Sequence, residues 1–319
     1  MDAIRTSRRE AMKTLGALAA AGGGVGGCAA PEPPAPVKWS VGTERPRTRV
    51  PANAADCHHH IYDSQYPWAP EATLKPGEAT VADYRLLQRR IGTTRDVIVQ
   101  PSSYGIDNRL LLASIAQLGS QARGVAVVNT SVTDEQLAEL HKGGVRGIRF
   151  NLSPPGTTTL DMVKPLAARV ARLGWHVQVN APAAYLLEQR ATWADLPCPV
   201  VFDHLAHAPQ PDAINHPVFA MVVDLLQKGR AYVKLSGFYA DTKVGPPTYS
   251  DSVVVAAAYA KAAPQRALWG SDWPHPTEQA SNRIPNDALL LDLLSGAVPD
   301  ETARNRILVD NPAALYQFA

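Results

Sequence analysis

The sequence predicts an α/β protein with the (β/α)8 TIM-barrel fold, and three observations support this class. From about residue 52 onward, short apolar runs alternate with helical patterns, which indicates parallel strands joined by crossover helices. Eight such units fit into about 265 residues, the usual size of this barrel. Titratable residues stand at the ends of several apolar runs, where catalytic groups of a barrel lie.

Each predicted unit is a short strand followed by a helical or loop segment. Helical patterns cover residues 108–118, 134–142, 160–173 and 252–262, and we expect residues 242–251 to form a rim loop or lid. A flat doubly wound sheet is the alternative, but the first strand is not followed by a glycine-rich phosphate turn. The predicted strands are residues 54–61, 96–100, 124–129, 145–150, 175–180, 200–204, 231–236 and 267–272.

Residues 1–30 have the pattern of an export signal. Arg8 and Arg9 precede a weakly apolar stretch, as in twin-arginine signals, and a glycine-rich run follows. Gly27-Cys28 resembles a lipoprotein processing box, which would leave Cys28 as a lipid anchor. Cleavage after Ala30 is the alternative. We therefore expect export by the twin-arginine route to a periplasmic or membrane-anchored location.

The remainder divides into a proline-rich tether, residues 31–50, and one barrel domain, residues 51–319. The net charge of +2 gives no sign of nucleic-acid binding, and the chain has no apolar run long enough for a membrane span. Cys57 and Cys198 are expected to be free buried thiols, although export would permit a disulfide between them.

Strand alternation predicts which side chains converge at the barrel mouth. His58 and His60 share one face of the first strand, and His59 points to the other. Because the first and last strands are neighbours in a barrel, Asp272 should meet these histidines. The same alternation brings Gln100, Asn151, Gln178 and Ser236 inward. The expected catalytic set is His58, His60, His204 and Asp272.

Further polar residues near the strand ends are candidates for substrate binding. Arg149 is expected to bind a substrate carboxylate, with membership of a structural ion pair as the alternative. The full expected set is Arg149, Ser102, Tyr104, Asn180 and Tyr239. Other residues have structural interpretations: Trp269 and Trp273 should pack against helices, and the expected structural or rim histidines are His59, His176, His207 and His275.

Several of these segments together resemble amidohydrolase family 2 over essentially the whole barrel. Within that family, the chain is similar to the 2-pyrone-4,6-dicarboxylate lactonases and, more distantly, to D-galactarolactone isomerase. The resemblance implies a metal-dependent-hydrolase-like barrel. It is carried by the stretches 96–100, 105–108, 143–151, 202–204, 233–239 and 269–276.

The resemblance also bears on metal binding. His-x-His on the first strand with a strand-eight aspartate is the skeleton of a zinc or manganese site. Metal-using members add a strand-five histidine, where this chain has Asn180, and the resemblance to lactonases with this pattern implies a reaction without metal. We therefore expect no metal cofactor; if one is bound, its ligands should be His58, His60, His204 and Asp272.

The expected activity is hydrolysis of a small-molecule lactone. Asp272 would activate water, the histidines would stabilise the oxyanion, and His204 would protonate the leaving oxygen. One arginine and one tyrosine that contact the substrate in the pyrone lactonases have no counterpart in this chain. Their loss favours a lactone with at most one carboxylate. The alternatives are a metal-dependent amidohydrolase or decarboxylase, a sugar-lactone isomerase and a non-catalytic binding protein; the isomerase has asparagine in place of Asp272.

Overall fold

A computed structural model describes residues 36–153 and 156–319, and the predicted export signal lies outside these residues. The described residues form one sheet of eight parallel strands that follow one another in chain order. The strands are β1 Ala55–His59, β2 Arg95–Val99, β3 Ala122–Ala126, β4 Val145–Asn151, β5 His176–Asn180, β6 Val200–Phe202, β7 Ala231–Leu235 and β8 Ala267–Trp269.

The segment after β8 brings the last strand back to the first. Asp272 N donates to His58 O at 2.7 Å, and His60 N donates to Trp273 O at 2.8 Å. The sheet is therefore a nearly closed barrel, and the predicted fold class is confirmed.

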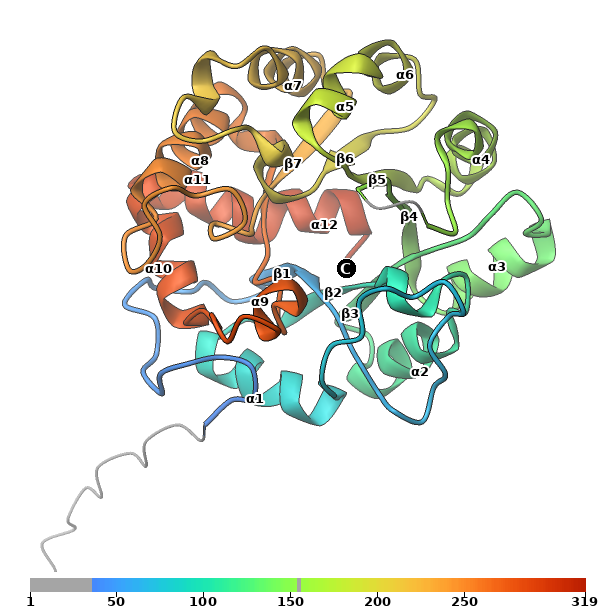
Figure 1. Cartoon of the computed structure of the whole chain (residues 1–319), viewed down its shortest axis with the longest axis horizontal. Helices are drawn as coiled ribbons and strands as arrows, with labels where there is room; N and C mark the ends of the chain where they lie inside the picture. Colours follow the sequence, from blue (N-terminus) through green and yellow to red (C-terminus); the bar gives the residue numbers. More distant parts are fainter. Residues whose placement is uncertain (1–35, 154–155) are drawn as a thin grey trace, which may run out of the picture. The chain divides into compact units, whose positions relative to one another are not determined.

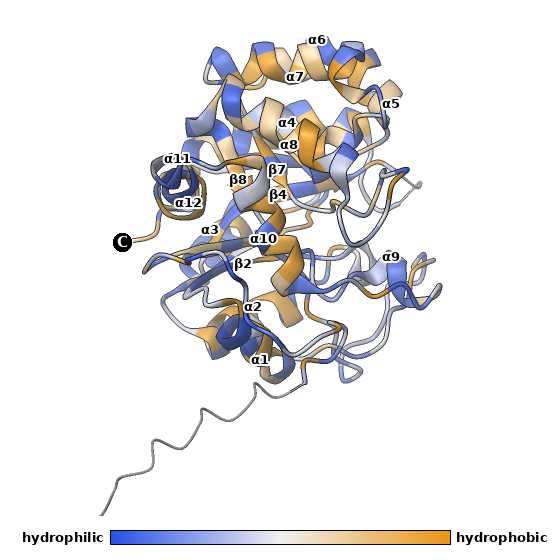
Figure 2. Cartoon of the chain, turned by 90° about the vertical axis from the view of Figure 1, so that its left-hand side faces the viewer, coloured by the Kyte–Doolittle hydropathy of each residue, from blue (hydrophilic) through white to orange (hydrophobic). Residues whose placement is uncertain are grey.

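Helices surround the strands of this barrel (Figure 1). The N-termini of α1 (Val81–Ile91) and α3 (Asp134–Lys142) are fixed by capping boxes, in which Thr80 pairs with Asp83 and Thr133 with Gln136. Figure 2 shows hydrophobic residues along β8 and α10 (Asp287–Ala297), whereas α11 (Glu301–Asn305) is mostly hydrophilic. The helices are α1 Val81–Ile91, α2 Arg109–Leu118, α3 Asp134–Lys142, α4 Val163–Val170, α5 Ala183–Glu188, α6 Arg190–Ala194, α7 Pro217–Gln227, α8 Ser250–Ala262, α9 Pro276–Gln279, α10 Asp287–Ala297, α11 Glu301–Asn305 and α12 Asn311–Tyr316.

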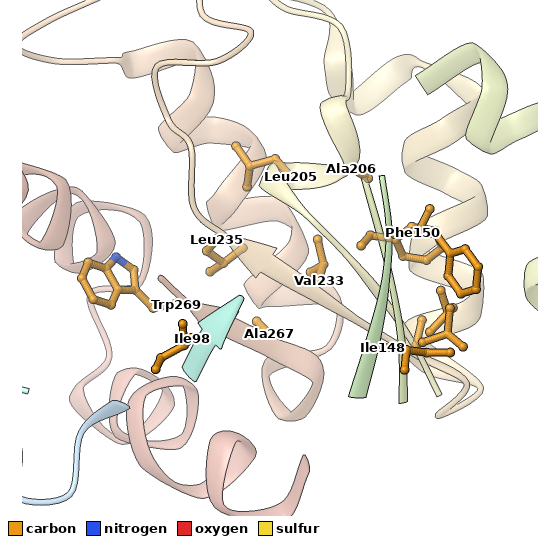
Figure 3. Packing of buried hydrophobic residues seen from close by; sticks show 14 of the residues in the cluster. Ile98, Ile148, Phe150, Leu205, Ala206, Val233, Leu235, Ala267 and Trp269 are labelled. Carbon is orange, nitrogen blue, oxygen red and sulfur yellow. The ribbon is translucent and has the colours of Figure 1, made fainter. Parts of the chain in front are cut away.

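The hydrophobic core has an outer and an inner part. The outer core lies between the strands and the helices and includes Ile98, Phe150 and Trp269 (Figure 3). Trp273 is also fully buried there, so both tryptophans pack as expected. The inner core contains Cys57, Val97, Val99, Val125, Val201 and Leu268, packed with Tyr316 and Phe318 of the C-terminal segment. Cys57 and Cys198 are free and buried, as predicted.

A register shift in β1 places the histidines. Asp56 pairs with Asp96 and His59 pairs with Ile98. Between these pairs β1 advances by three residues while β2 advances by two, which is a β-bulge. This bulge lets Cys57 join the inner core while His58 still points to the mouth. His59 points outward and its Nε2 lies 3.0 Å from Asp96, which confirms the predicted division between the histidines.

The strands β6 and β8 end earlier than the sequence predicts, at Phe202 and Trp269 rather than at residues 204 and 272. The chain after β6 forms the turn His204–His207, and all four of its φ angles are positive, between 46° and 56°. Asp272 also has a positive φ, 63°. Such backbone is costly for residues other than glycine and gathers at functional sites.

The alternation predicted for β2 is wrong at its end. Val97 and Val99 face the inner core, so Gln100 faces the other way and its amide donates to Asp107 O at 2.7 Å. Ser102 still reaches the mouth because Ser102–Tyr104 forms a 3-10 turn that redirects the chain.

The described part of the predicted tether lies against the barrel. Ser40 accepts a hydrogen bond from Arg90 of α1, and Thr48 contacts Asp292 of α10. The barrel unit therefore includes residues that the sequence assigned to the tether. None of the helices in residues 36–153 and 156–319 is long and apolar enough to cross a membrane.

Candidate active site

Asp272 lies at the centre of the barrel mouth and is surrounded by imidazoles. Its Oδ1 is 3.5 Å from His58 Nε2, 3.4 Å from His60 Nε2 and 3.9 Å from His204 Nε2. The other oxygen, Oδ2, accepts a hydrogen bond from the Tyr239 hydroxyl at 2.5 Å. The structure thus brings together the four residues predicted as catalytic and gives the two carboxylate oxygens different surroundings.

The second nitrogen of each imidazole has its own partner, which fixes the orientation of the ring. His60 Nδ1 lies 2.8 Å from Val99 O, and His204 Nδ1 lies 3.0 Å from Ser236 Oγ. His58 Nδ1 lies 3.3 Å from Asp203 Oδ1. All three Nε2 atoms are consequently directed at Asp272.

Two glycines make room for these rings. A Cβ at Gly270 would lie 2.6 Å from the Cβ of His58, and one at Gly237 would lie 2.8 Å from His204 Nδ1. Gly237 also has φ +61°, which a larger residue adopts only with strain. The chain directly after β7 and directly after β8 can therefore approach the histidines only as glycine.

A fully buried layer of charged and polar groups lies directly behind His58. Lys234 Nζ is 3.2 Å from His58 Nδ1, 3.6 Å from Asp203 Oδ1 and 2.8 Å from Gln178 Oε1. Asp203 Oδ2 accepts from Gln178 at 3.1 Å and from Arg149 Nε at 3.3 Å. Two cations and one carboxylate therefore share this layer, which adds positive charge behind the imidazoles.

Burial and neighbouring charge shift the pKa values of these groups. Burial lowers the pKa of Lys234 to about 8, against the attraction of Asp203. Burial also lowers the pKa of His58 well below its ordinary value, and the Lys234 ammonium adds to this effect. Although burial opposes its charge, the surrounding imidazoles hold the pKa of Asp272 well below its usual range. At neutral pH the site thus contains an ionised carboxylate and a neutral His58.

A pocket of about 190 Å³ opens above Asp272. Four of the five predicted substrate-binding residues line it, namely Ser102, Arg149, Asn180 and Tyr239. Tyr104 does not: its hydroxyl bonds to the backbone of Asp63 at 3.0 and 3.2 Å, and its ring stacks on Trp68. The structure therefore corrects that interpretation and makes Tyr104 a packing residue.

The four histidines expected to be structural have different environments. His59 stacks on Tyr84, and His176 is fully buried under Tyr316. His275 is buried but bonds to Tyr239, a residue of the mouth. His207 lines the pocket, where its Nε2 lies 2.7 Å from Asn180 Oδ1.

Sequence reasoning missed the roles of Asp203 and Lys234. Lys234 has the same strand parity as Ser236, so a lysine within the apolar run of β7 was the signal that could have identified it. Asp203 precedes His204 but shares the parity of Val201, an inner-core residue. Gln178 was predicted to point inward, but its contacts with both residues were not foreseen.

The donor atoms around Asp272 also fit a divalent metal. Within the described chain, His58, His204 and Asp272 each offer one ligand atom, and these atoms lie within 4.8 Å of one another. His58 Nε2 is buried and has no hydrogen-bond partner among the described residues. Ligands about 2.1 Å from a tetrahedral zinc lie about 3.4 Å apart, similar to the spacing of Asp272 Oδ1 from His58 and His60. Imidazole and carboxylate are ligands that zinc and manganese accept.

The barrel and its His-His-His-Asp mouth define an amidohydrolase-type enzyme. Residues 55–318 match the family model described as amidohydrolase, and the chain belongs to this family. It is 33% identical over 290 residues to 2-pyrone-4,6-dicarboxylate hydrolase of Comamonas testosteroni, an alignment that covers 87% of this chain and 94% of the relative. This confirms the resemblance inferred from the sequence motifs.

Two further relatives and one solved structure show the same kinship. The chain is 30% identical to 4-sulfomuconolactone hydrolase of Rhizobium radiobacter, with 84% and 91% of the two chains covered. It is also 30% identical to D-galactarolactone isomerase of Agrobacterium fabrum, with 86% and 94% covered. A crystal structure from Agrobacterium tumefaciens without ligand superimposes with a TM-score of 0.82 at 29% identity, covering 88% of this chain and 99% of that one.

Proposed function

We propose that this protein hydrolyses a lactone, with Asp272 as the general base. The observation that carries the proposal is the ionised carboxylate of Asp272 facing three imidazoles at the bottom of a pocket. Two of the relatives reported above are named as hydrolases of a pyrone dicarboxylate and of a sulfomuconolactone, both cyclic esters.

The first step is the attack of water on the lactone carbonyl carbon. Asp272 Oδ1 accepts a proton from the water as the new C–O bond forms, and the carbonyl oxygen becomes an oxyanion. The histidines that line the pocket, with the buried positive charge of Lys234 and Arg149 behind them, would stabilise this negative charge.

The second step is the breaking of the ring C–O bond. His204, whose Nε2 lies 3.9 Å from Asp272 Oδ1, would pass the proton from Asp272 to the leaving ring oxygen. The products are a hydroxyl group and a carboxylic acid on one open chain, and the acid releases its proton to solvent.

We propose that this reaction proceeds without a metal cofactor. The buried ammonium of Lys234, 3.2 Å from His58 Nδ1, already supplies positive charge beside the site and opposes the arrival of a dication. Where a divalent metal is bound, His58, His60, His204 and Asp272 would hold it, and it would polarise the carbonyl and make bound water more acidic.

The charges that line the pocket limit the substrate. Among the described residues, Arg149 is the one lysine or arginine that lines the pocket over Asp272, and its Nε is engaged by Asp203. The remaining polar groups are hydroxyls, amides and imidazoles, such as Ser102, Asn151 and Asn180. This supports a lactone with at most one carboxylate, such as a sugar-derived or aromatic-derived lactone.

A panel of neutral, monocarboxylate and dicarboxylate lactones, followed with a pH indicator, tests the activity. The Asp272→Asn variant should lower kcat on the best substrate by on the order of 1,000-fold or more, because a neutral amide accepts no proton. Asp195→Asn is the matched control, since Asp195 forms an ion pair with Lys164 on the surface. Full activity of Asp272→Asn, or no turnover of any lactone by the wild type, would refute the proposal.

Metal analysis of the purified protein, with kinetics before and after chelation, tests the metal-free mechanism separately. Activity should survive chelation unchanged. If chelation abolished turnover and zinc or manganese restored it, the metal-free mechanism would be wrong while lactone hydrolysis would stand.

A further inference from the structure

A chain of hydrogen bonds leads from Asp272 away from the pocket. The Tyr239 hydroxyl donates to Asp272 Oδ2 at 2.5 Å, and His275 Nδ1 lies 3.1 Å from the same hydroxyl oxygen. His275 Nε2 in turn lies 3.1 Å from Asp287 Oδ2. His275 and Asp287 are fully buried, and the four residues come from the loops after β7 and β8 and from the start of α10.

The valences of these groups fix where the hydrogens lie. A tyrosine hydroxyl has one hydrogen, and the ionised Asp272 can only accept. If Tyr239 donated to His275 instead, its oxygen and Asp272 Oδ2 would face each other at 2.5 Å with no hydrogen between them. Tyr239 must therefore donate to Asp272, and its oxygen must accept from His275 Nδ1–H.

The same reasoning extends to Asp287. Since His275 Nδ1 carries a hydrogen, the close contact between Nε2 and Asp287 Oδ2 needs a second hydrogen, held on the ring or on the carboxyl group. In either arrangement the pair is neutral overall and keeps Nδ1 as a donor. Asp287 thus determines, through His275, the direction in which the Tyr239 hydroxyl points.

We propose that His275 and Asp287 are positioning residues that lock the Tyr239 hydroxyl onto Asp272 Oδ2. This inference rests on the proposed role of Asp272 as the base. With Oδ2 held, the carboxylate cannot rotate, and Oδ1 stays among the three imidazoles as the oxygen that takes the proton from water. Tyr239, predicted from the sequence to bind substrate, acts instead on the base.

The kinetic test uses three variants, Tyr239→Phe, His275→Asn and the double variant. Asparagine suits position 275 because φ is 56° there. Tyr239→Phe should lower kcat by about 10- to 100-fold, the value of one charge-assisted hydrogen bond, and leave KM within about threefold. His275→Asn should lower kcat in the same way, and the double variant should be no slower than Tyr239→Phe, because both remove one interaction.

Other kinetic outcomes would overturn the proposal. A rise in KM with unchanged kcat for Tyr239→Phe would make Tyr239 a substrate contact, and multiplying losses in the double variant would make His275 independent of Tyr239. Tyr259→Phe is the matched control: its buried hydroxyl has no partner among the described residues, so kcat should not change.

A second measurement does not depend on turnover. In protein labelled with ¹⁵N-histidine, the His275 signals are assigned by their loss in His275→Asn. The proposal requires a protonated Nδ1 at neutral pH, and an Nδ1 with a free lone pair would refute it. If no lactone were hydrolysed but Nδ1 were protonated, the hydrogen-bond chain would stand and the proposed function would fail.

Discussion

Lys234 is the residue that links the catalytic histidines to the interior of the barrel. Its fully buried ammonium contacts His58, Gln178 and Asp203, and Asp203 also contacts Arg149. Taking such charges out of water is costly, and the cost is offset only while each charge keeps its partners. The geometry of His58 therefore depends on a lysine that does not line the pocket.

Removing this cation should affect both stability and activity. Lys234→Met keeps the length of the side chain but leaves the Asp203 carboxylate buried with Arg149 as its remaining cation, so the free energy of unfolding should fall by about 3–5 kcal/mol. Because His58 loses a neighbour at Nδ1, kcat should fall as well. Urea denaturation and steady-state kinetics measure the two effects.

The surface lysine Lys228 provides the comparison. It pairs with Asp224 one helical turn away, and Lys228→Met should change the unfolding free energy by no more than about 0.5 kcal/mol. Equal, small effects of the two substitutions would show that the buried ion layer does not stabilise the fold.

At the scale of the elements, strand alternation accounts for most of the mouth. It correctly predicted that His58 and His60 face inward and His59 outward, since alternation holds wherever the backbone stays extended. The prediction failed at Gln100, because Val97 and Val99 face the inner core and the next residue therefore faces away from the mouth; Ser102 reaches the mouth only through the 3-10 turn that follows. The bulge in β1 and the left-handed turn at residues 204–207 depend on neighbouring strands, which a local pattern does not reveal.

The outward His59 ties β1 to β2 through Asp96 and makes stability depend on pH. Burial raises the pKa of Asp96 to about 8 from its ordinary value of 3.8 and lowers that of His59 to about 3 from 6.5. Between pH 4 and 6.5 the His59–Asp96 pair holds one proton in the folded state and one in the unfolded state. In this range the pair therefore makes no pH-dependent contribution to stability. Above 6.5 the unfolded pair loses its proton while folded Asp96 keeps one up to about pH 8. Stability should therefore fall as pH rises through this window.

The expected fall is about 2 kcal/mol between pH 6.5 and 8, since one proton changes stability by about 1.4 kcal/mol per pH unit. Chemical denaturation at a series of pH values measures it. Asp96→Asn cannot hold or release this proton, so its stability should change less over the same window. A wild type that is equally stable at both ends of the window contradicts the pKa assigned to Asp96.

For the molecule as a whole, the order of elements along the chain was sufficient to predict the barrel. Eight short apolar runs separated by helical patterns leave few other ways to bury both faces of a parallel sheet. The packing of the C-terminal segment into the inner core was not predicted, because Tyr316 and Phe318 lie far along the chain from the strand residues that they contact. Arg123 donates to the carbonyls of Tyr316 and Gln317, at 3.2 and 2.9 Å, which fixes this C-terminal segment.

The C-terminal segment should be essential for the stability of the whole barrel. Tyr316 is fully buried, packs with Cys57 and Val99 in the inner core and meets His176 edge-on, with ring centroids 5.2 Å apart. Tyr316→Ala would leave a cavity at the centre of the barrel and should lower the free energy of unfolding by about 3–5 kcal/mol. The Tyr316 hydroxyl is buried without a partner in the described residues, so Tyr316→Phe should be neutral or slightly stabilising. Thermal and urea unfolding of the two variants distinguish the lost ring from the lost hydroxyl, and a marked loss of stability in Tyr316→Phe would mean that the hydroxyl is bonded after all.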